Sequence, residues 1–355
     1  MNRLVLVGGG LVHLEVLRRM ASTPFPDTEV VLVSDRAQAV YAGMLPGVVS
    51  GFYETDEMTV DLAGLAKAAG ITFQRVSMTG LDAGSFQVLL QDGARLDYTH
   101  MSLNTGATAR SVSETAKGKV LSIKPAPVFM ADLCAWEESA LRDGQVGVIG
   151  GGVAGIELAF ALAHRWKGCR PAPVLVERSG TALERVPAAA RARVRRHLDR
   201  AGITVHTSDT APELDLSINA AGAAAPAWLS QTGLPLDKQG FVVICPTLQV
   251  EGHDRIFASG DMAGMRDHPR AKAGVFAVRQ GPALYRNLSR VLAGQSPLPH
   301  LPQTDWLSLI ATGGRHAIAT RNSLAIEGAF AWWMKDINDR SYLKKYRGIT
   351  GGTSE

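Results

Sequence analysis

Short apolar runs recur along this chain, and two of them are followed by a glycine-rich turn and then by apolar residues at helical spacing. The first run is Arg3 to Val7, which precedes Gly8 to Gly10 and the helix-like stretch Leu11 to Met20. A further apolar run, Glu29 to Val33, closes the unit. This order predicts a βαβ unit that binds a dinucleotide, because only a turn without side chains lets a pyrophosphate reach the N-terminus of a helix.

This first unit departs from the usual dinucleotide fingerprint at two positions. The third glycine is replaced by His13. The second strand leads into Ser34, with Asp35 one step later, where an acid usually binds a ribose hydroxyl. We still expect the unit to bind a cofactor through Gly8, Gly10, His13, Ser34 and Asp35, because a second copy follows downstream.

The second unit carries the complete fingerprint. Gln145 to Ile149 predicts a strand, and Gly150, Gly152 and Gly155 then have the G-x-G-x-x-G spacing at the start of a helix-like stretch. The next strand ends in Glu177, whose carboxylate would accept hydrogen bonds from an adenosine 2′-hydroxyl and repel a 2′-phosphate. The pattern therefore predicts an NADH site, with NADPH as the alternative because Arg178 is adjacent.

Two stretches between these units predict further contacts with the first cofactor. Tyr41 to Gly47 is dense in glycine and proline and predicts a loop along a flavin ring, with an ordinary connection as the alternative. Met101 to Thr108 predicts a strand that leads into a Thr-Gly turn. The residues expected to contact the cofactor are Met44, Leu45, Pro46, Thr105 and Gly106.

The chain returns to the first cofactor after the second unit. Arg255 to Ala258 predicts a strand, and Gly260 and Asp261 follow it, so that the carboxylate would bind ribityl hydroxyls. Arg270 to Leu288 predicts a helix whose N–H groups, near Gly274 and Val275, would face the flavin edge where negative charge accumulates on reduction.

Composition and charge agree with a two-domain α/β protein. The chain has 355 residues, 46% of them hydrophobic, and a net charge of +4 with scattered basic residues, so we expect no nucleic-acid binding. Its three cysteines, Cys134, Cys169 and Cys245, are far apart, which favours a reducing cytoplasm and gives no metal site. No apolar stretch reaches about 18 residues, so no transmembrane helix is expected.

Together these motifs resemble the two-dinucleotide-binding-domain flavoproteins, the group that includes type II NADH dehydrogenases and sulfide:quinone oxidoreductases. The match is closest to the FAD-dependent pyridine nucleotide-disulfide oxidoreductase-like proteins associated with selenide, water dikinase. The residues that carry it are Gly8 to Leu17, Met44 to Gly47, Lys124-Pro125, Gly150 to Glu157, Phe257 to Asp261, Ala277 to Pro282 and Trp332 to Tyr346. The resemblance implies FAD and NADH as cofactors and association with selenide, water dikinase.

The resemblance also implies a domain order. We expect an α/β fold of two Rossmann-like domains, with the NAD(H) domain inserted in a split FAD domain. The predicted segments are 1–121 and 241–300 for FAD, 122–240 for NAD(H), and 301–355 for a C-terminal cap. Within the NAD(H) domain, Leu183 to Ala201 predicts a helix whose arginines, Arg185 among them, form a solvated face rather than a phosphate clamp.

Departures from better-known relatives narrow the chemistry. Gly43 to Phe52 contains no cysteine, which excludes a redox-active dithiol there, and Cys134 and Cys245 are interpreted as ordinary thiols. The glutamine pair that faces quinone in type II NADH dehydrogenases corresponds to Arg279 and Gln280, so half of that pair is missing. Gln280 and Lys124, a neighbour of the flavin or a surface lysine, are the catalytic candidates.

The C-terminal segment and the function leave alternatives open. Phe330, Trp333, Met334 and Ile337 form a helical stripe that could pack over the flavin, form a homodimer or lie on the inner face of a membrane; we favour packing or dimerisation. The expected function is hydride transfer from NAD(P)H to FAD, and then electron transfer to a quinone or a small sulfur or selenium compound. The alternatives are a flavin-binding redox-sensing or partner-binding protein with little turnover, and a specialised metabolite oxidoreductase reduced by its own substrate.

Overall fold

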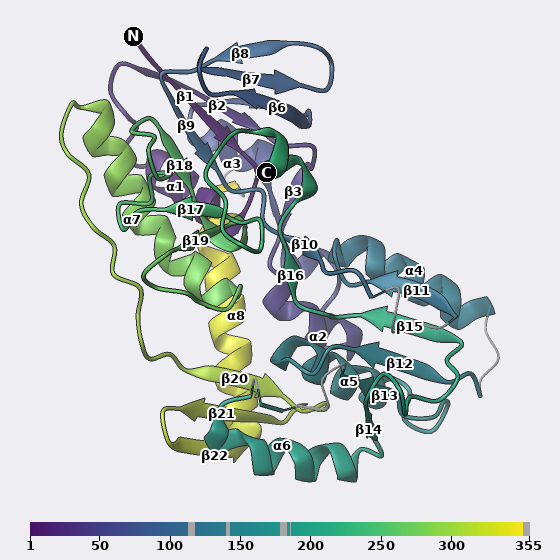
Figure 1. The fold of residues 1–355 in the computed structure, drawn as a ribbon. Helices are drawn as coiled ribbons and strands as arrows, with labels where there is room; N and C mark the ends of the chain where they lie inside the picture. The colour runs from purple at the N-terminus through teal and green to yellow at the C-terminus, as the bar shows by residue number, and fades with distance from the viewer. Residues whose placement is uncertain (113–117, 140–142, 178–182, 185, 351–355) are drawn as a thin grey trace, which may run out of the picture.

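Two five-stranded parallel sheets organise the molecule, and each belongs to one lobe (Figure 1). The computed structural model describes residues 1–112, 118–139, 143–177, 183–184 and 186–350. Arg178 and Arg185 lie outside the described residues. The predicted α/β class with two Rossmann-like sheets is confirmed, whereas the exact domain boundaries remain predictions.

The first sheet has the strand order β18-β9-β1-β2-β5. Its strands are β1 (Asn2–Val7), β2 (Thr28–Val33), β5 (Thr72–Gln74), β9 (His100–Leu103) and β18 (Ile256–Ala258). Helices α1 (Leu11–Met20), α3 (Leu62–Ala68) and α7 (Gly274–Leu292) accompany it. Because β18 pairs with β9 after a long excursion of the chain, the first sheet is completed by a late segment, as a split domain requires.

Helices α1 and α7 approach each other closely. A Cβ at Gly281 would lie 2.6 Å from the Cβ of Glu15, so only glycine permits this packing.

Smaller elements complete the lobe: β3 (Gln38–Val40) pairs with β4 (Thr59–Asp61), and β6 (Met78–Asp82), β7 (Gln87–Leu90) and β8 (Arg95–Asp97) form an antiparallel sheet. A pair of parallel strands, β17 (Val242–Ile244) and β19 (Ala263–Met265), lies near the start of α7.

The second sheet has the order β11-β15-β12-β13-β14. Its strands are β11 (Lys119–Ser122), β12 (Val146–Ile149), β13 (Val174–Val176), β14 (Val205–His206) and β15 (Leu216–Asn219), with helices α4 (Ala126–Ser139), α5 (Val153–Arg165) and α6 (Ala188–Arg200). Helix α6 begins five residues later than Leu183, where the sequence predicts its start, because Pro187 disfavours helical backbone at the residue before it.

The chain crosses between the lobes through two short strands that pair with each other. Strand β10 (Thr108–Ala109) leaves the first sheet and β16 (Ala223–Ala224) returns from the second, and they form an antiparallel ribbon. The Arg110 amide donates to the carbonyl of Gly222 (3.0 Å), and the Asn219 side chain donates to the carbonyl of Arg110 (2.9 Å). Both crossings are therefore tied together.

The predicted loop at residues 41–47 is wrong. The chain forms a 3-10 turn, η1 (Ala42–Met44), and a short helix, α2 (Leu45–Val49). Leu45, Pro46 and Val49 are buried, and a proline in the first helical turn costs no hydrogen bond, so the segment folds as a packed helix. The remaining 3-10 turns are η2 (Asp56–Met58), η3 (Ala227–Gln231) and η4 (Gly260–Met262).

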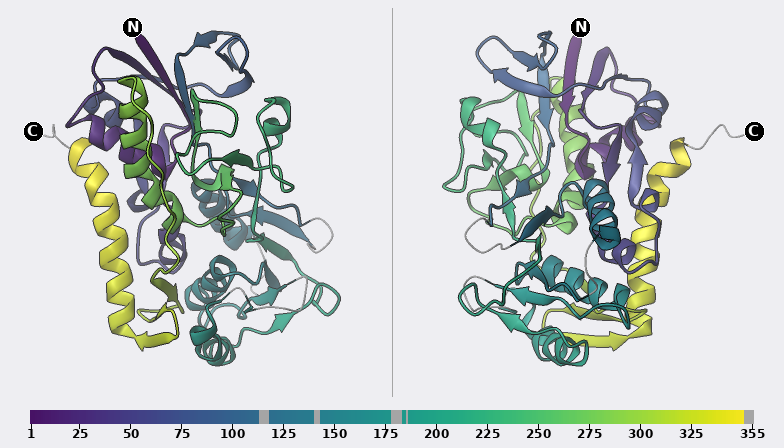
Figure 2. Two further views of the ribbon diagram at one scale, coloured as in Figure 1. Left: turned by 60° about the vertical axis from the view of Figure 1, so that its left-hand side comes forward. Right: turned by 90° about the vertical axis from the view of Figure 1, so that its right-hand side faces the viewer.

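The C-terminal segment bridges the lobes. Strands β20 (Ser308–Ala311), β21 (Ala317–Arg321) and β22 (Leu324–Gly328) form a small antiparallel sheet beside α5 and α6, and α8 (Ala329–Thr350) then runs back along the first lobe (Figure 2). The predicted packing of the apolar stripe over the flavin is wrong, because Phe330, Trp333 and Ile337 are 70%, 50% and 61% exposed. Trp332, Tyr342, Leu343 and Tyr346 form the buried face instead.

Candidate functional site

A cavity of about 1940 Å³ lies between the lobes. It is lined by residues at the carboxyl ends of β1, β2 and β9 in the first sheet and of β12, β13 and β15 in the second. A pocket for one ordinary ligand measures about 300–1000 Å³, so this cavity has room for two dinucleotides. The predicted site residues that line it are Gly8, Gly10, Ser34, Asp35, Leu45, Pro46, Thr105, Gly106, Lys124, Gly150, Gly152, Glu177, Gly260, Asp261, Gly274 and Val275.

Four predicted site residues do not line this cavity. His13 and Met44 are buried in the core of the first lobe. Gly155 packs inside the second unit, and the side chain of Gln280 accepts a hydrogen bond from the amide of Gly260 (2.7 Å). These residues support the walls of the cavity, and Gln280 in particular fixes the turn that leads into Asp261.

The first glycine turn, which we call the FAD cradle, comprises Gly8 to His13. Its first turn of helix is capped from a neighbouring strand: Asn104, which follows β9, accepts hydrogen bonds from the amides of Val12 (3.2 Å) and His13 (3.3 Å). The Asn104 amide group donates to the carbonyl of Ser259 (2.9 Å). A Cβ at Gly10 would lie 2.1 Å from the Asn104 side-chain oxygen, so glycine is required there.

His13 stands at the position of the third glycine. It stabilises the turn through hydrogen bonds of its side chain, whereas a glycine does so by allowing close packing. Its Nδ1 donates to the carbonyl of Gly8 (2.6 Å), and Ser102 donates to its Nε2 (2.8 Å), because a carbonyl can only accept. The ring is fully buried, and burial lowers the pKa of His13 to about 4, although the bond to Gly8 raises it in part. At neutral pH the imidazole is therefore uncharged and acts as a fixed brace inside the cradle.

The second glycine turn, which we call the NAD cradle, comprises Gly150 to Gly155 and follows the usual design. A Cβ at Gly155 would lie 2.0 Å from the carbonyl oxygen of Gly150, which is the close helix–strand contact that the third glycine permits. Gly152, which caps α5, has open space on its Cβ side. At the end of β13, Glu177 lines the cavity, as expected for a residue that meets an adenosine ribose.

The wall of the cavity near η4 and the start of α7 gathers charged residues from distant parts of the chain. Lys124, just after β11, lies 3.9 Å from the carboxylate of Asp261 in η4. Lys272, two residues before α7, donates to the carbonyl of Ala263 (2.6 Å) and lies 4.0 Å from the centre of the Phe241 ring. Burial lowers the pKa of Lys272, partly offset by Asp237 and Asp261. This wall offers cationic groups beside the N-terminus of α7, where an anionic group is stabilised.

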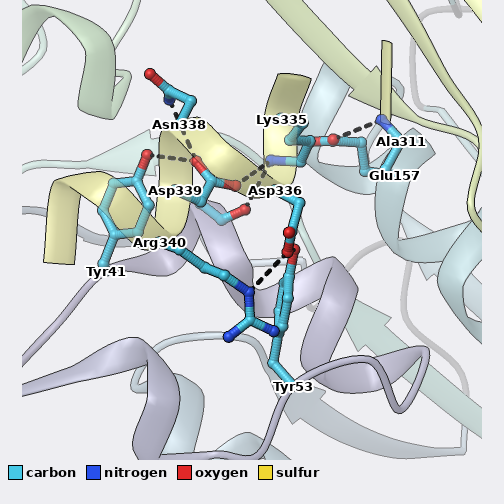
Figure 3. Close-up of polar contacts among 10 residues, drawn as sticks. Tyr41, Tyr53, Glu157, Ala311, Lys335, Asp336, Asn338, Asp339 and Arg340 are labelled. Carbon is cyan, nitrogen blue, oxygen red and sulfur yellow. Dashed lines mark hydrogen bonds and ion pairs between the residues drawn. The ribbon is translucent and has the colours of Figure 1, made fainter. Parts of the chain in front are cut away.

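A buried polar cluster forms the wall between α5 and α8 (Figure 3). Lys335 donates to Asp339 (2.9 Å) and to the carbonyl of Gly43 (3.0 Å), and Tyr41 donates to Asp339 (3.0 Å). Glu157, on α5, accepts from the amide of Ala311 (2.9 Å). Each of these four side-chain groups lines the large cavity.

The charges in this cluster depend on one another. Burial raises the pKa of Glu157 more than the nearby Lys335 lowers it. Burial also opposes the charge of Lys335, but Glu157 and Asp339 outweigh burial and hold the Lys335 pKa above its usual range. One turn earlier on the same buried face of α8, Asp336 accepts hydrogen bonds from Tyr53 (2.7 Å) and from Arg340 (2.9 Å), and the bond from Tyr53 anchors the helix to the first lobe.

The cysteines and the possible metal ligands can be located in the described part of the chain. Cys134, Cys169 and Cys245 are all free, and burial raises the pKa of Cys245, which disfavours a reactive thiolate. Within the described ranges, no group of three or more His, Cys, Asp or Glu side chains could hold a metal ion.

Comparison with known proteins identifies the family to which this chain belongs. The profile of the pyridine nucleotide-disulphide oxidoreductase family matches residues 2–216. The chain belongs to this family. Membership confirms the prediction of a flavoprotein oxidoreductase that uses FAD and NAD(P)H.

The relatives of this family member span several activities. It is 25% identical over 295 residues to demethylphylloquinone reductase NdbB of Synechocystis, covering 75% of this chain and 72% of the relative. It is 21% identical to the NADH dehydrogenase-like protein YutJ of Bacillus subtilis, covering 89% and 91%. Its fold matches the crystal structure of the sulfide:quinone oxidoreductase of Aquifex aeolicus with a TM-score of 0.80 at 16% identity, covering 98% and 92%.

Several residues that build this family member's site are absent from the sequence prediction. Asn104 could have been found as a polar residue that ends a buried strand, directly before the predicted Thr105-Gly106 turn. Lys335 and Asp339 carried a weaker signal, an opposite-charge pair four residues apart in a helix with apolar neighbours. Tyr41 could not be placed, because its partner lies almost 300 residues later in the chain.

Proposed function

We propose that this chain passes a hydride from NADH to FAD and then passes the electrons to a small-molecule acceptor. The observation that carries the proposal is that one cavity is lined by both glycine cradles. In such a cavity, bound FAD would supply a two-electron carrier, and NADH would supply the hydride. Two separate cavities would instead keep the two nucleotides apart.

The residues of the chain divide the work of holding the two nucleotides. The FAD cradle and Asp261 fit a resident dinucleotide, because Gly10 and Asn104 leave no room for a side chain where the backbone must approach a phosphate. The NAD cradle and Glu177 fit the second dinucleotide and favour a free 2′-hydroxyl. Lys124 and the N-terminus of α7 would stabilise negative charge at the flavin end.

We propose a quinone or a small sulfur or selenium compound as the acceptor. The names of two relatives support this class, since one is a demethylphylloquinone reductase and another a sulfide-quinone reductase. Reduction of either kind of acceptor takes up protons. Glu157 could hold such a proton at the cavity wall, because burial raises its pKa.

An anaerobic titration tests the hydride step. NADH added to the flavin-containing protein should bleach the absorbance band of oxidised flavin with about one equivalent per chain, and NADPH should do so less effectively. Reoxidation by a quinone, or by a selenium or sulfur compound, would then identify the acceptor. Flavin that stays oxidised with both nucleotides would contradict the proposal and favour the alternatives, a redox-sensing module or an enzyme reduced by its own substrate.

The exposed surface of the protein also offers a site for a membrane or for a second copy of the chain. The exposed side chains of Leu324, Ile326, Phe330, Trp333 and Ile337 form an apolar surface on β22 and α8. We propose that this surface makes either a peripheral membrane contact or the homodimer contact, and co-sedimentation with liposomes distinguishes the two. In the described part of the chain, no helix is long and apolar enough to cross a bilayer. Association with selenide, water dikinase remains a prediction.

A further inference from the structure

A second, smaller cavity of about 50 Å³ adjoins the large one. The two share part of their lining, including Asp261 and Lys272. The smaller cavity also reaches Gln280, His300 and Gln303, which do not line the larger one. Its size suits a few waters or one small ion, because a water needs only about 10–15 Å³ of such space.

Two buried hydrogen-bond donors at this small cavity have no partner. They are the Nε of Arg270 and the side-chain nitrogen of Gln303. Both residues line the cavity. A buried donor without an acceptor costs free energy, so a native protein rarely retains one unless a ligand or a water completes it. Two such donors at one small cavity indicate a bound group that accepts hydrogen bonds.

Arg270 is held in place by contacts that leave Nε unused. Its two terminal nitrogens donate to the carbonyls of Pro302 and Gln303, and its guanidinium lies 5.3 Å from the centre of the Phe276 ring. Among the described residues, no carboxylate forms an ion pair with Arg270. The guanidinium is therefore oriented by neutral carbonyls, and its positive charge is not neutralised.

The surroundings of the cavity are cationic. Arg270, Lys272 and Arg279 line it, as do His268 and His300. Burial lowers the pKa of His300, and the charges of Arg286 and Arg270 lower it further. The acid in the lining is Asp261, which faces Lys124 at 3.9 Å, and Asp237 lies near Lys272. An acceptor that carries negative charge therefore suits this cavity better than water does.

We propose that this cavity binds one small oxyanion, of the sulfate or phosphate class, through Arg270, Gln303 and Lys272. The oxyanion could be a free inorganic ion or a phosphate group of the nicotinamide nucleotide in the adjoining cavity. The proposal does not depend on electron transfer to an acceptor, because it concerns only the small cavity.

Isothermal titration of the flavin-containing protein with sodium sulfate and with sodium phosphate tests the proposal, with sodium chloride holding the ionic strength constant. We expect saturable binding of one ion per chain. Gln303→Leu should weaken binding about tenfold, because it removes one uncompensated donor and retains the volume. Gln303→Glu should abolish binding and raise the midpoint of thermal unfolding, because the new carboxylate can itself pair with Arg270.

A matched variant controls for charge. Gln295→Glu makes the same change of charge at an exposed position outside the cavity, so it should bind the ions as the wild type does.

Repeating the titration with saturating NAD⁺ identifies the source: unchanged sulfate binding indicates a free ion, and displacement indicates a nucleotide phosphate. If neither ion binds saturably, or if Gln303→Glu binds them as the wild type does, the proposal is wrong.

Discussion

The FAD cradle and the NAD cradle have the same design but are completed in different ways. In the FAD cradle, Asn104 caps the first turn of α1, and His13 braces the carbonyl of Gly8. In the NAD cradle the corresponding asparagine at the end of β15, Asn219, bonds to the amide of Ala221 and the carbonyl of Arg110 instead. Within the described residues, no side chain caps the first turn of α5.

In the FAD cradle the protein itself binds the free amides of the first helical turn, whereas in the NAD cradle these amides are left for the ligand. The FAD cradle satisfies two of the helix amides with a side chain, so it is ordered before any phosphate arrives. The NAD cradle leaves these amides to the ligand. The first arrangement suits a cofactor that stays bound, and the second suits one that binds and leaves in each turnover.

The largest expected effect on nucleotide use comes from adding one methyl group to the NAD cradle. Gly155→Ala would place Cβ 2.0 Å from the Gly150 carbonyl, and relieving the overlap should cost about 1–3 kcal/mol. We expect flavin reduction by NADH to need about ten- to hundredfold more nucleotide, while flavin content is unchanged. Gly152→Ala, whose Cβ meets no atom within 4 Å, should weaken NADH binding without lowering the unfolding temperature. Equal thermal stability of the two variants would contradict this assignment.

The second effect concerns pH and belongs to the FAD cradle. His13 is neutral when buried, with a pKa of about 4, and titrates near 6.5 when the chain unfolds. The unfolded chain therefore binds the extra proton first, so stability is lost as the pH falls from about 6.5 to 4, by about 3 kcal/mol. Urea unfolding of the wild type and of His13→Gln should differ in slope over this range. Parallel pH profiles would argue against a buried neutral imidazole.

The two asparagines give the third prediction. Asn104→Ala removes the cap of α1 and should cost about 1–2 kcal/mol, with flavin lost on dilution. Asn219→Ala, its matched counterpart, should leave flavin content unchanged because its bonds lie in the ribbon between the lobes. Flavin fluorescence released on dilution measures both. Equal release from the two variants would show that capping does not distinguish the cradles.

The smallest effect is one of nucleotide preference. Glu177→Gln removes the negative charge that faces a 2′-phosphate and retains a hydrogen-bond acceptor for a 2′-hydroxyl. We expect the preference for NADH over NADPH to fall about fivefold, equal to about 1 kcal/mol, in the ratio of kcat/KM values. An unchanged ratio would place the discrimination elsewhere in the NAD cradle.

Local patterns predicted both cradles, because a strand, a glycine turn and a helix are specified within about 30 residues of sequence. The return of the chain to the first sheet was also predictable, since Gly260 and Asp261 come shortly after the apolar run that forms β18. The role of His13 was not. Its departure from glycine is visible in the sequence, but the bond from Ser102 depends on how β9 pairs with β1.

The buried polar cluster between α5 and α8 was missed for a different reason. The sequence predicts an amphipathic helix whose apolar stripe packs over the flavin, forms a dimer contact or lies on a membrane. In the structure that stripe is exposed, and the buried face carries Lys335, Asp336 and Asp339. Burying such charges is favourable only when their partners are in place, and those partners, Tyr41, Tyr53 and Glu157, come from remote segments. Hydrophobic periodicity alone cannot identify a buried helix face whose polar side chains are paired with residues far away in the sequence.

The ribbon of β10 and β16 has a mechanical consequence. Two independent tethers would let one lobe swivel on the other, but two strands that are hydrogen-bonded side by side resist twisting and shear while they still bend across their plane. The ribbon does not act alone, because α2 packs on α5 and the C-terminal segment also bridges the lobes. A sideways slip of one lobe would have to break the hydrogen bonds of the ribbon, so the ribbon helps to keep both cradles facing the same cavity.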